Sequence, residues 1–165
     1  MQGLFYTPDK KMAVENTIEA EKVKKRFETW EDSANIKFQS VYSPGDADIR
    51  IAFEPGSSWS AVGIAAKAIA TDKPTLNLGW LSGKAEPTEA DRGIILHEFG
   101  HALGLLHEHQ SPARGQHIHL DEYEVYNYYT PLLGSRALVK SQIIDTYNKG
   151  TVLNMTKFDI TSIMM

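Results

Sequence analysis

Apolar residues recur at steps of three and four between Lys10 and about Ser33, and this spacing predicts a helix. Glu and Lys fill the positions between them, so one face is apolar and the other is charged. The apolar stripe consists of Ala20, Val23, Phe27, Trp30 and Ala34. We expect the helix to pack this stripe against a sheet.

Three later segments alternate apolar and polar residues, as half-buried strands do. They are Ile36–Val41, Asp48–Phe53 and Thr75–Leu81. Ser43–Asp46 predicts a turn between the first two. Val62–Ala70 is apolar or small except at Lys67, and its periodicity does not decide between a strand and a short buried helix. Glu54–Ser60 has the composition of a loop, and Gly83–Pro87 that of a linker.

The clearest helix of the chain has a start signal and a stop signal. Thr88–Asp91 has the T-x-x-D pattern of a helix cap, with an acidic residue in the first turn. Leu96, Phe99 and Leu103 form an apolar stripe. Gly104 ends the helix, because glycine adopts the left-handed terminal conformation without strain.

Two further helices are predicted in the second half. One starts near Asp121 and ends before Pro131, and the other runs from about Arg136 to Asn148. Lys157–Met165 reads as a turn and a tail. Strands thus lie mostly in the first half and helices in the second. This order favours an α+β fold, a small twisted mixed sheet backed by helices.

Composition excludes several classes of protein. The 165 residues are one domain's length, so we expect a single domain over residues 1–165. Seventeen basic and 21 acidic residues give a net charge of −4, which makes nucleic acid and anionic membranes poor partners. No stretch approaches the roughly 20 apolar residues of a membrane span. The absence of cysteine removes thiol nucleophiles and disulfide scaffolds.

The start of the chain bears on the compartment. Met1-Gln2-Gly3 leads into polar sequence without the basic and apolar regions of a signal peptide. We therefore expect either a cytoplasmic protein or a mature domain cut from a longer precursor.

All six histidines lie between His97 and His119, and this clustering indicates a metal site. Residues 97–107 read HEFGHALGLLH. Residues four apart on a helix project from the same face about 6 Å apart along the axis, so His97 and His101 can share one ion. Glu98 is rotated by about 100° from His97 and lies beside the metal, as a base acting on metal-bound water must.

A sharp turn at Gly104 brings His107 back towards the same ion. Three neutral imidazoles with a fourth position left to water form a catalytic zinc arrangement. These ligands also favour zinc over magnesium or calcium. The sequence therefore predicts one catalytic Zn²⁺.

Other ligand sets stay open at this point. His109 can replace His107 if the turn after Gly104 is longer. A different zinc class takes its third ligand from a carboxylate on a later helix, for which Glu122 and Glu124 are the candidates.

The remaining histidines and the tyrosines have simpler explanations. His109, His117 and His119 stand in a polar loop that favours exposure. Core packing and helix amphipathicity account for the four tyrosines Tyr123, Tyr126, Tyr128 and Tyr129.

These motifs resemble those of a known family. HEFGHALGLLH resembles the extended zinc signature of the metzincin metalloproteases, and the continuation Glu108-His109-Gln110 is most similar to the astacin branch. Residues 158–164, FDITSIM, resemble the astacin Met-turn. Looser similarity in ADIRIAF, GSSWSAVG and TLNLGW extends the resemblance back to about residue 47.

The resemblance implies a metzincin-like catalytic domain with a zinc-binding active-site helix and a Met-turn. It implies that the zinc ligands are His97, His101 and His107. It makes Glu98 the general base and places Met164 beneath the zinc histidines. Glu108 matches the position that anchors the mature amino terminus in astacins. An edge strand for an extended substrate is implied at Leu76, Asn77, Leu78 and Gly79.

This sequence departs from the family at two points. Animal astacins carry disulfides, which a chain without cysteine lacks. A tyrosine that can ligate zinc follows their Met-turn, whereas here Met165 is the last residue. We therefore expect a chain that stops just after the Met-turn, short of the segment that walls the substrate pocket.

The expected function is that of a zinc endopeptidase acting on an extended protein or peptide through metal-bound water and Glu98. A zinc-binding module without turnover, or a zinc amidase acting on small or cell-wall peptides, is the alternative. The resemblance favours a secreted protein. We expect a monomer.

Overall fold

The computed structural model describes residues 2–5, 22–41, 43–81, 86–115, 118–152 and 154–165. The chain falls into two compact units, Met1–Leu105 and Leu106–Met165. Part of the predicted first helix (residues 10–21), part of the predicted linker and His117 lie outside the described residues. The expectation of one domain stays a prediction.

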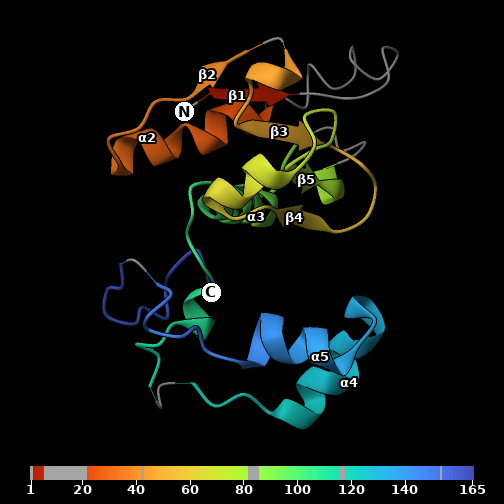
Figure 1. Cartoon of the computed structure of the whole chain (residues 1–165), viewed down its shortest axis with the longest axis vertical. Helices are drawn as coiled ribbons and strands as arrows, with labels where there is room; N and C mark the ends of the chain where they lie inside the picture. Colours follow the sequence, from red (N-terminus) through yellow and green to blue (C-terminus); the bar gives the residue numbers. More distant parts are fainter. Residues whose placement is uncertain (1, 6–21, 42, 82–85, 116–117, 153) are drawn as a thin grey trace. The chain divides into compact units, whose positions relative to one another are not determined.

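The first unit is built on a five-stranded mixed sheet (Figure 1). The strand order is β2-β1-β3-β5-β4. The neighbours β2, β1, β3 and β5 pair in parallel, and β4 runs antiparallel to β5. The strands are β1 (Gln2–Phe5), β2 (Gln39–Ser40), β3 (Ile49–Ala52), β4 (Ser58–Ser60) and β5 (Leu76–Leu78). The mixed sheet with its helices confirms the α+β fold.

Strand β3 is buried along its whole length rather than on one face. The predicted alternation of exposure was therefore wrong, because elements cover both faces of a strand paired in parallel on each side. Arg50 shows how a charge is accommodated there. Its guanidinium donates to the carbonyl oxygens of Lys73 at 2.7 Å, Ala47 at 3.1 Å and Ile69 at 3.2 Å.

Two segments between β3 and β5 differ from their sequence interpretation. The predicted loop Glu54–Ser60 ends in strand β4, whose central residue Trp59 pairs with Asn77 of β5. The ambiguous segment Val62–Ala70 forms the 3₁₀ helix η2 (Gly63–Ala68). This helix is largely exposed, and Ile64 retains 81% of its accessible surface.

The predicted turn Ser43–Asp46 and the predicted strand Thr75–Leu81 are each confirmed only in part. The predicted turn forms the 3₁₀ helix η1 (Pro44–Asp46). The predicted strand Thr75–Leu81 is a strand only as β5 and then turns into η3 (Gly79–Leu81). This change of geometry leaves Trp80 exposed, although the alternating pattern had placed it on the apolar face.

The helices of this unit contact each other through aromatic side chains. Residues 22–27 are helical, followed by α2 (Thr29–Ser33), and α3 spans Glu89–Ala102. Phe27 stacks on Phe99 of α3 at a ring-centroid distance of 4.5 Å. Burial of such a side chain contributes roughly 1.5–3 kcal/mol. The core cluster comprises Val23, Phe27, Ile49, Ile51, Phe53, Leu76, Leu78, Leu81, Ile95 and Phe99.

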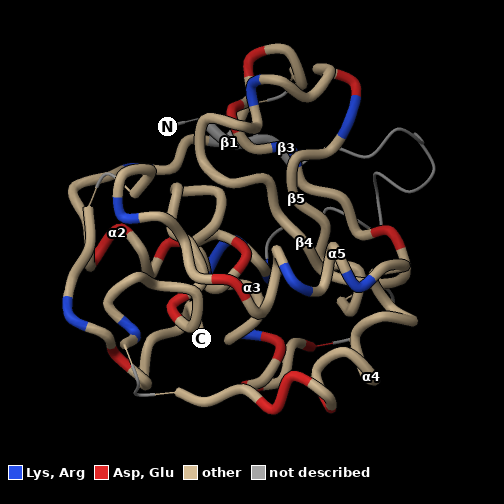
Figure 2. The backbone as a smooth tube through the Cα atoms, turned by 60° about the horizontal axis from the view of Figure 1, so that its bottom comes forward, with Lys and Arg blue, Asp and Glu red and all other residues tan. Residues whose placement is uncertain are grey.

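The second unit is helical. It contains η4 (Glu108–Gln110), α4 (Glu122–Leu133), α5 (Arg136–Val139) and the π-helical turn η5 (Lys140–Ile144). Asp121 caps α4 as predicted, but the helix continues past Pro131 to the left-handed Gly134. The third helix ends at Ile144 rather than at Asn148. Basic and acidic positions are interspersed along the trace (Figure 2).

Candidate metal centre and active site

Helix α3 begins with the cap that the sequence predicts. The Thr88 hydroxyl accepts a hydrogen bond from the backbone N–H of Asp91 at 3.2 Å, and the Asp91 carboxylate accepts from the backbone N–H of Thr88 at 2.8 Å. Two otherwise unpaired donors are satisfied, and the acidic side chain lies at the positive end of the helix dipole. Ile95 and Phe99 then fix the helix to the core, with at most 1% of their surface exposed.

Three imidazoles converge in the structure. His97 and His101 stand one turn apart on α3, with ring centroids 4.7 Å apart and planes at 90°. One ligand nitrogen from each of His97, His101 and His107 lies within 4.8 Å of the other two. Three nitrogens at this separation can coordinate one small cation, and an all-imidazole set suits zinc.

The end of α3 turns the chain sharply between the second and third histidines. Gly104 has φ of +101°. Its N–H donates to the carbonyl oxygen of His101 at 2.8 Å, and the N–H of Leu105 donates to that of Gly100 at 2.9 Å. This pair of bonds is the Schellman motif, which favours glycine at its left-handed position because glycine has no Cβ to strain the backbone there.

The same turn orients His101. Its Nδ1 lies 2.8 Å from the carbonyl oxygen of Leu105. A carbonyl oxygen only accepts, so Nδ1 carries the proton and Nε2 keeps its lone pair for a metal. Metal-binding histidines in proteins are commonly held in this way through the nitrogen that does not ligate.

Glu98 lies between His97 and His101 in the sequence. Its side chain is buried, with 8% of its surface exposed. Burial raises the pKa of its carboxyl to about 7, because desolvation disfavours the charged form. A carboxyl with a pKa near neutrality can exchange protons readily at physiological pH. A cation held by the neighbouring imidazoles favours the carboxylate form.

The Met-turn is tied to the residue that follows His107. The backbone N–H of Glu108 donates to the carbonyl oxygen of Met164 at 2.8 Å, and the Glu108 side chain accepts from the backbone N–H of Asp159 at 3.1 Å. The side chain of Met164 is buried, with 3% exposed. The predicted place of Met164 beneath the histidines stays a prediction, as does anchoring of the amino terminus by Glu108.

Gln110 is a polar side chain at this site that the sequence analysis did not single out. It is 1% exposed, and its Oε1 lies 3.3 Å from Nδ1 of His107. Its Nε2 donates to the carbonyl oxygens of Ser141 at 3.0 Å and Asp145 at 2.8 Å. A glutamine three residues after a histidine carries no signal of such burial, because the partners come from a segment more than thirty residues away.

Comparison with known proteins identifies the chain. The family model "Astacin (Peptidase family M12A)" matches residues 4–165. The chain belongs to the astacin family. The resemblance of the zinc signature and the Met-turn to this branch of the metzincins is thereby confirmed.

Individual relatives agree with the family. A solved structure of myroilysin superposes with a TM-score of 0.81 at 32% identity, covering 99% of this chain and 75% of that one. A second myroilysin structure gives 0.68 at 30% identity, with 99% and 68% covered.

Two curated proteins are also similar to this astacin-family chain. Serralysin of Proteus mirabilis is 29% identical over 56% of this chain and 22% of its own length. Zinc metalloproteinase nas-26 of Caenorhabditis elegans is 30% identical over 60% of this chain and 21% of its own length. The chain thus spans about a fifth of the curated relatives it matches.

The alternative ligands, His109 or a carboxylate of Glu122 or Glu124, do not form such a cluster with His97 and His101 among the described residues. Among the residues that the structure describes, His97, His101 and His107 form the one group of three or more His, Asp or Glu side chains with ligand atoms this close. Glu122 and Glu124 are exposed on α4. His109 stacks on His107 at a centroid distance of 5.0 Å.

The expected substrate strand needs correction in this astacin-family fold. Leu76–Gly79 was expected to be an edge, but β5 lies between β3 and β4 and is paired on both sides. The edge assignment was wrong, because the loop-like sequence before Val62 hid the strand β4. Gly79 is also buried against the loop before β4, where a Cβ would lie 2.6 Å from the carbonyl oxygens of Glu54 and Gly56.

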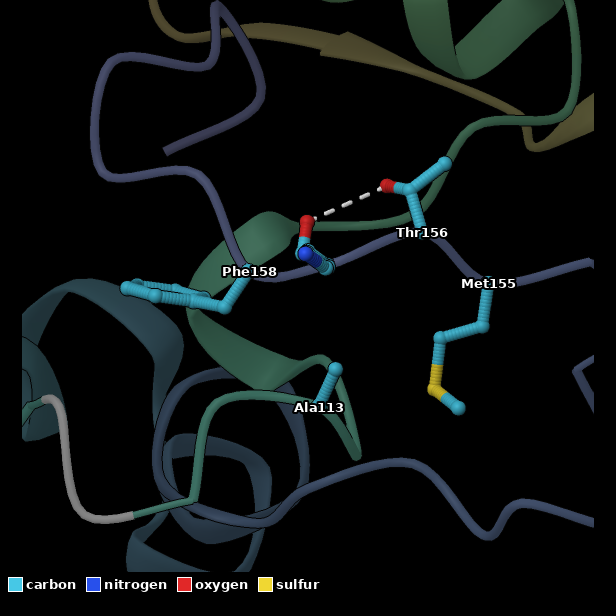
Figure 3. A pocket seen from close by; sticks show the side chains of 5 residues that line it. Ala113, Met155, Thr156 and Phe158 are labelled. Atoms are coloured by element: carbon cyan, nitrogen blue, oxygen red, sulfur yellow. Dashed lines mark hydrogen bonds between the residues drawn. The ribbon is translucent and has the colours of Figure 1, made fainter.

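A hollow of about 520 Å³ lies in the second unit, just before the Met-turn (Figure 3). It is lined by Ala113, Met155, Thr156, Lys157 and Phe158. The Thr156 hydroxyl donates to the carbonyl oxygen of Lys157 at 3.2 Å.

None of the helices in the described part of the chain is both long and apolar enough to span a membrane.

Proposed function

We propose that this chain is a zinc-dependent endopeptidase that hydrolyses peptide bonds in extended proteins or peptides. The observation that carries the proposal is the convergence of one nitrogen from each of His97, His101 and His107 within 4.8 Å, next in sequence to the buried carboxyl of Glu98. Membership of a peptidase family supports the reaction type.

In this proposal the three histidines hold one zinc ion. The fit rests on the donor set, which is three imidazoles, and on the bond from His101 Nδ1 to a carbonyl oxygen, which leaves Nε2 for the metal. Bound zinc supplies a Lewis acid that polarises the scissile carbonyl and acidifies a water molecule.

Glu98 acts as the general base and then as the general acid. Its carboxylate takes a proton from the attacking water and afterwards delivers it to the leaving amine. Burial raises the pKa of Glu98 to about 7 in the metal-free chain, and a bound cation would favour the carboxylate form that takes the first proton.

Substrate pairing in this proposal falls to β4 rather than β5. β4 ends the strand order and packs against α3, which carries His97, Glu98 and His101. Because the N–H of Ala61 donates to the carbonyl oxygen of Thr75, the alternation of an antiparallel ladder turns the backbone groups of Ser58 and Ser60 away from β5. An extended peptide can pair with those groups as an added strand.

We also propose that the protein is secreted and monomeric. The family resemblance supports export. Cell fractionation tests the first point, and light scattering of the purified chain tests the second.

The deciding experiment combines metal analysis with cleavage. The purified chain is loaded with zinc, its metal content is measured, and it is incubated with casein, a second unfolded protein and a series of peptides of increasing length. One zinc per chain and cleavage that rises with peptide length and stops on chelation support the proposal. Tight zinc without cleavage identifies a binding module, and cleavage confined to small or cell-wall peptides identifies an amidase. Either result overturns the endopeptidase assignment.

A further inference from the structure

We propose that Gln110 is a positioning residue that fixes the tautomer of His107 and thereby presents Nε2 of that ring to the metal. The inference rests on the proposed zinc site and deepens it. It comes from the hydrogen bonds of one buried amide, all of which lie within the second unit.

The carbonyl partners determine which way the amide points. The Gln110 nitrogen lies 3.0 Å from the carbonyl oxygen of Ser141 and 2.8 Å from that of Asp145. A carbonyl oxygen only accepts, so the amide atom facing both must be the NH₂ group. The reverse orientation would bury three oxygens against one another without a proton, which costs the desolvation of each.

The orientation of the amide then determines the tautomer of the imidazole. With its NH₂ group committed, the atom of Gln110 that lies 3.3 Å from His107 Nδ1 is the oxygen, which only accepts. Nδ1 therefore carries the proton, and Nε2 retains the lone pair that a metal requires. Two backbone carbonyls thus determine the orientation of the Gln110 amide, and the amide determines the tautomer of His107.

Tyr147 completes the arrangement. Its hydroxyl donates to the same Gln110 oxygen at 3.1 Å, and its backbone N–H donates to the Gln110 carbonyl at 2.8 Å. Gln110 thus uses both donors and both lone pairs of its amide, which has no remaining hydrogen-bonding capacity. Because another orientation would break several bonds at once, the amide is held in one state.

The carbonyl partners stand at the end of a helix. Ser141 belongs to the π-helical turn η5, and Asp145 is its C-terminal cap. The last carbonyls of a helix have no partner within it, and Gln110 satisfies two of them. The side chain therefore has a structural role, through its nitrogen, and a role at the metal, through its oxygen. Variants can separate the two.

The test uses three variants. Gln110→Met removes both roles at similar volume, Gln110→Glu keeps an acceptor for His107 but loses the donors, and Tyr147→Phe removes a neighbouring bond without touching His107. Zinc affinity is measured by competition with a chelator, and folding is checked by circular dichroism at the same temperature. His107→Ala gives the affinity of a site without its third ligand.

We expect Gln110→Met to weaken zinc binding by about 10–100-fold, the range found when such partners are removed. Gln110→Glu should stay within about threefold of the parent, and Tyr147→Phe should lose less zinc affinity than Gln110→Met because it keeps the Gln110 acceptor, although both lower the melting temperature. Affinity then follows the acceptor, and stability follows the donors. A folded Gln110→Met chain that binds zinc within threefold of the parent would overturn the inference, as would equal losses in Gln110→Met and Gln110→Glu.

A spectroscopic measurement on the unaltered chain keeps the inference testable if Gln110→Met does not fold. Long-range ¹H–¹⁵N correlation of the metal-free protein at pH 8 should show His107 protonated at Nδ1 and unprotonated at Nε2. The opposite tautomer overturns the role of Gln110 without affecting the proposed peptidase. Conversely, equal zinc affinity of the parent and His107→Ala refutes the proposed ligand set and leaves the tautomer result standing.

Discussion

The backbone N–H of Glu108 is hydrogen-bonded to the carbonyl oxygen of Met164 at 2.8 Å. The residue that follows the third histidine is therefore joined directly to the methionine of the Met-turn, across 56 positions of sequence. A second hydrogen bond, from the Asp159 N–H to the Glu108 carboxylate at 3.1 Å, joins the side chain of Glu108 to the same Met-turn.

Removing the hydrogen bond between the Glu108 carboxylate and the Asp159 N–H should lower the stability of the protein. We expect Glu108→Ala to lower the free energy of unfolding by about 0.5–1 kcal/mol, since one hydrogen bond is lost while the backbone bond to Met164 remains. Glu108→Gln keeps an acceptor and should lose less than half as much. Urea denaturation of the three proteins measures the difference. Equal stability of Glu108→Ala and the parent would show that the side-chain bond contributes nothing.

Replacing the proposed base should separate metal binding from catalysis. We expect Glu98→Gln to keep one zinc per chain and to cleave casein at least 10²–10⁴-fold more slowly, because proton transfer in both steps is lost. Glu89→Gln, an exposed position in the first turn of the same helix, serves as the control and should cleave like the parent. Parental activity in Glu98→Gln would refute the mechanism.

The turn after α3 should matter for the metal beyond its effect on stability. Gly104 and Gly134 both have positive φ at a helix end, +101° and +83°, and a Cβ at either would meet no atom closer than 3.9 Å. An alanine should cost about 1–2 kcal/mol of unfolding free energy at each. Only Gly104→Ala should also weaken zinc binding, because it alone lies between two proposed ligands. Equal zinc affinity in the two variants would contradict the importance of this turn.

Metal removal should lower the thermal stability. Zinc at a hundred times its dissociation constant stabilises the folded state by about 2.7 kcal/mol, so chelation should lower the melting temperature by roughly 5–10 °C. Differential scanning calorimetry with and without chelator, followed by zinc addition, measures the shift. His107→Ala should show a much smaller shift. A full-sized shift in that variant would exclude His107 from the ligand set.

The Met-turn should also respond to acid. The hydroxyl and then the backbone N–H of Thr161 donate to the Asp159 carboxylate and hold its pKa below the ordinary value. A depressed folded-state pKa contributes stability above the unfolded-state pKa of about 3.9, and this contribution is lost as pH falls through the folded-state value. Carboxyl ¹³C titration should show the low pKa, and Thr161→Val should raise it. An unchanged pKa in that variant would assign the shift elsewhere.

Local chemistry made parts of the fold predictable. The Thr88–Asp91 cap and the turn at Gly104 were expected from the sequence because each depends on residues within a few positions of one another. The grouping of His97 and His101 follows in the same way from the pitch of a helix.

Features that depend on distant partners were not predictable. Strands β1 and β4 span only four and three residues and are defined by pairing with segments far along the chain, so neither carries enough of an alternating pattern to be predicted. Pro131 was expected to end a helix, yet α4 continues for two residues until Gly134 adopts its left-handed conformation. Gln110 is invisible to pattern analysis, since the carbonyls that orient it belong to residues 141 and 145.

The brevity of β4 has a consequence for solubility. An unpaired sheet margin is a template on which identical molecules can stack into aggregates, and proteins counter this by keeping such margins short. Three residues, two of them serines, offer too few backbone groups for lasting self-association. In the proposed function, a peptide that is also bound at the metal would still pair with β4, whereas a second copy of the protein would have only these three residues to pair with.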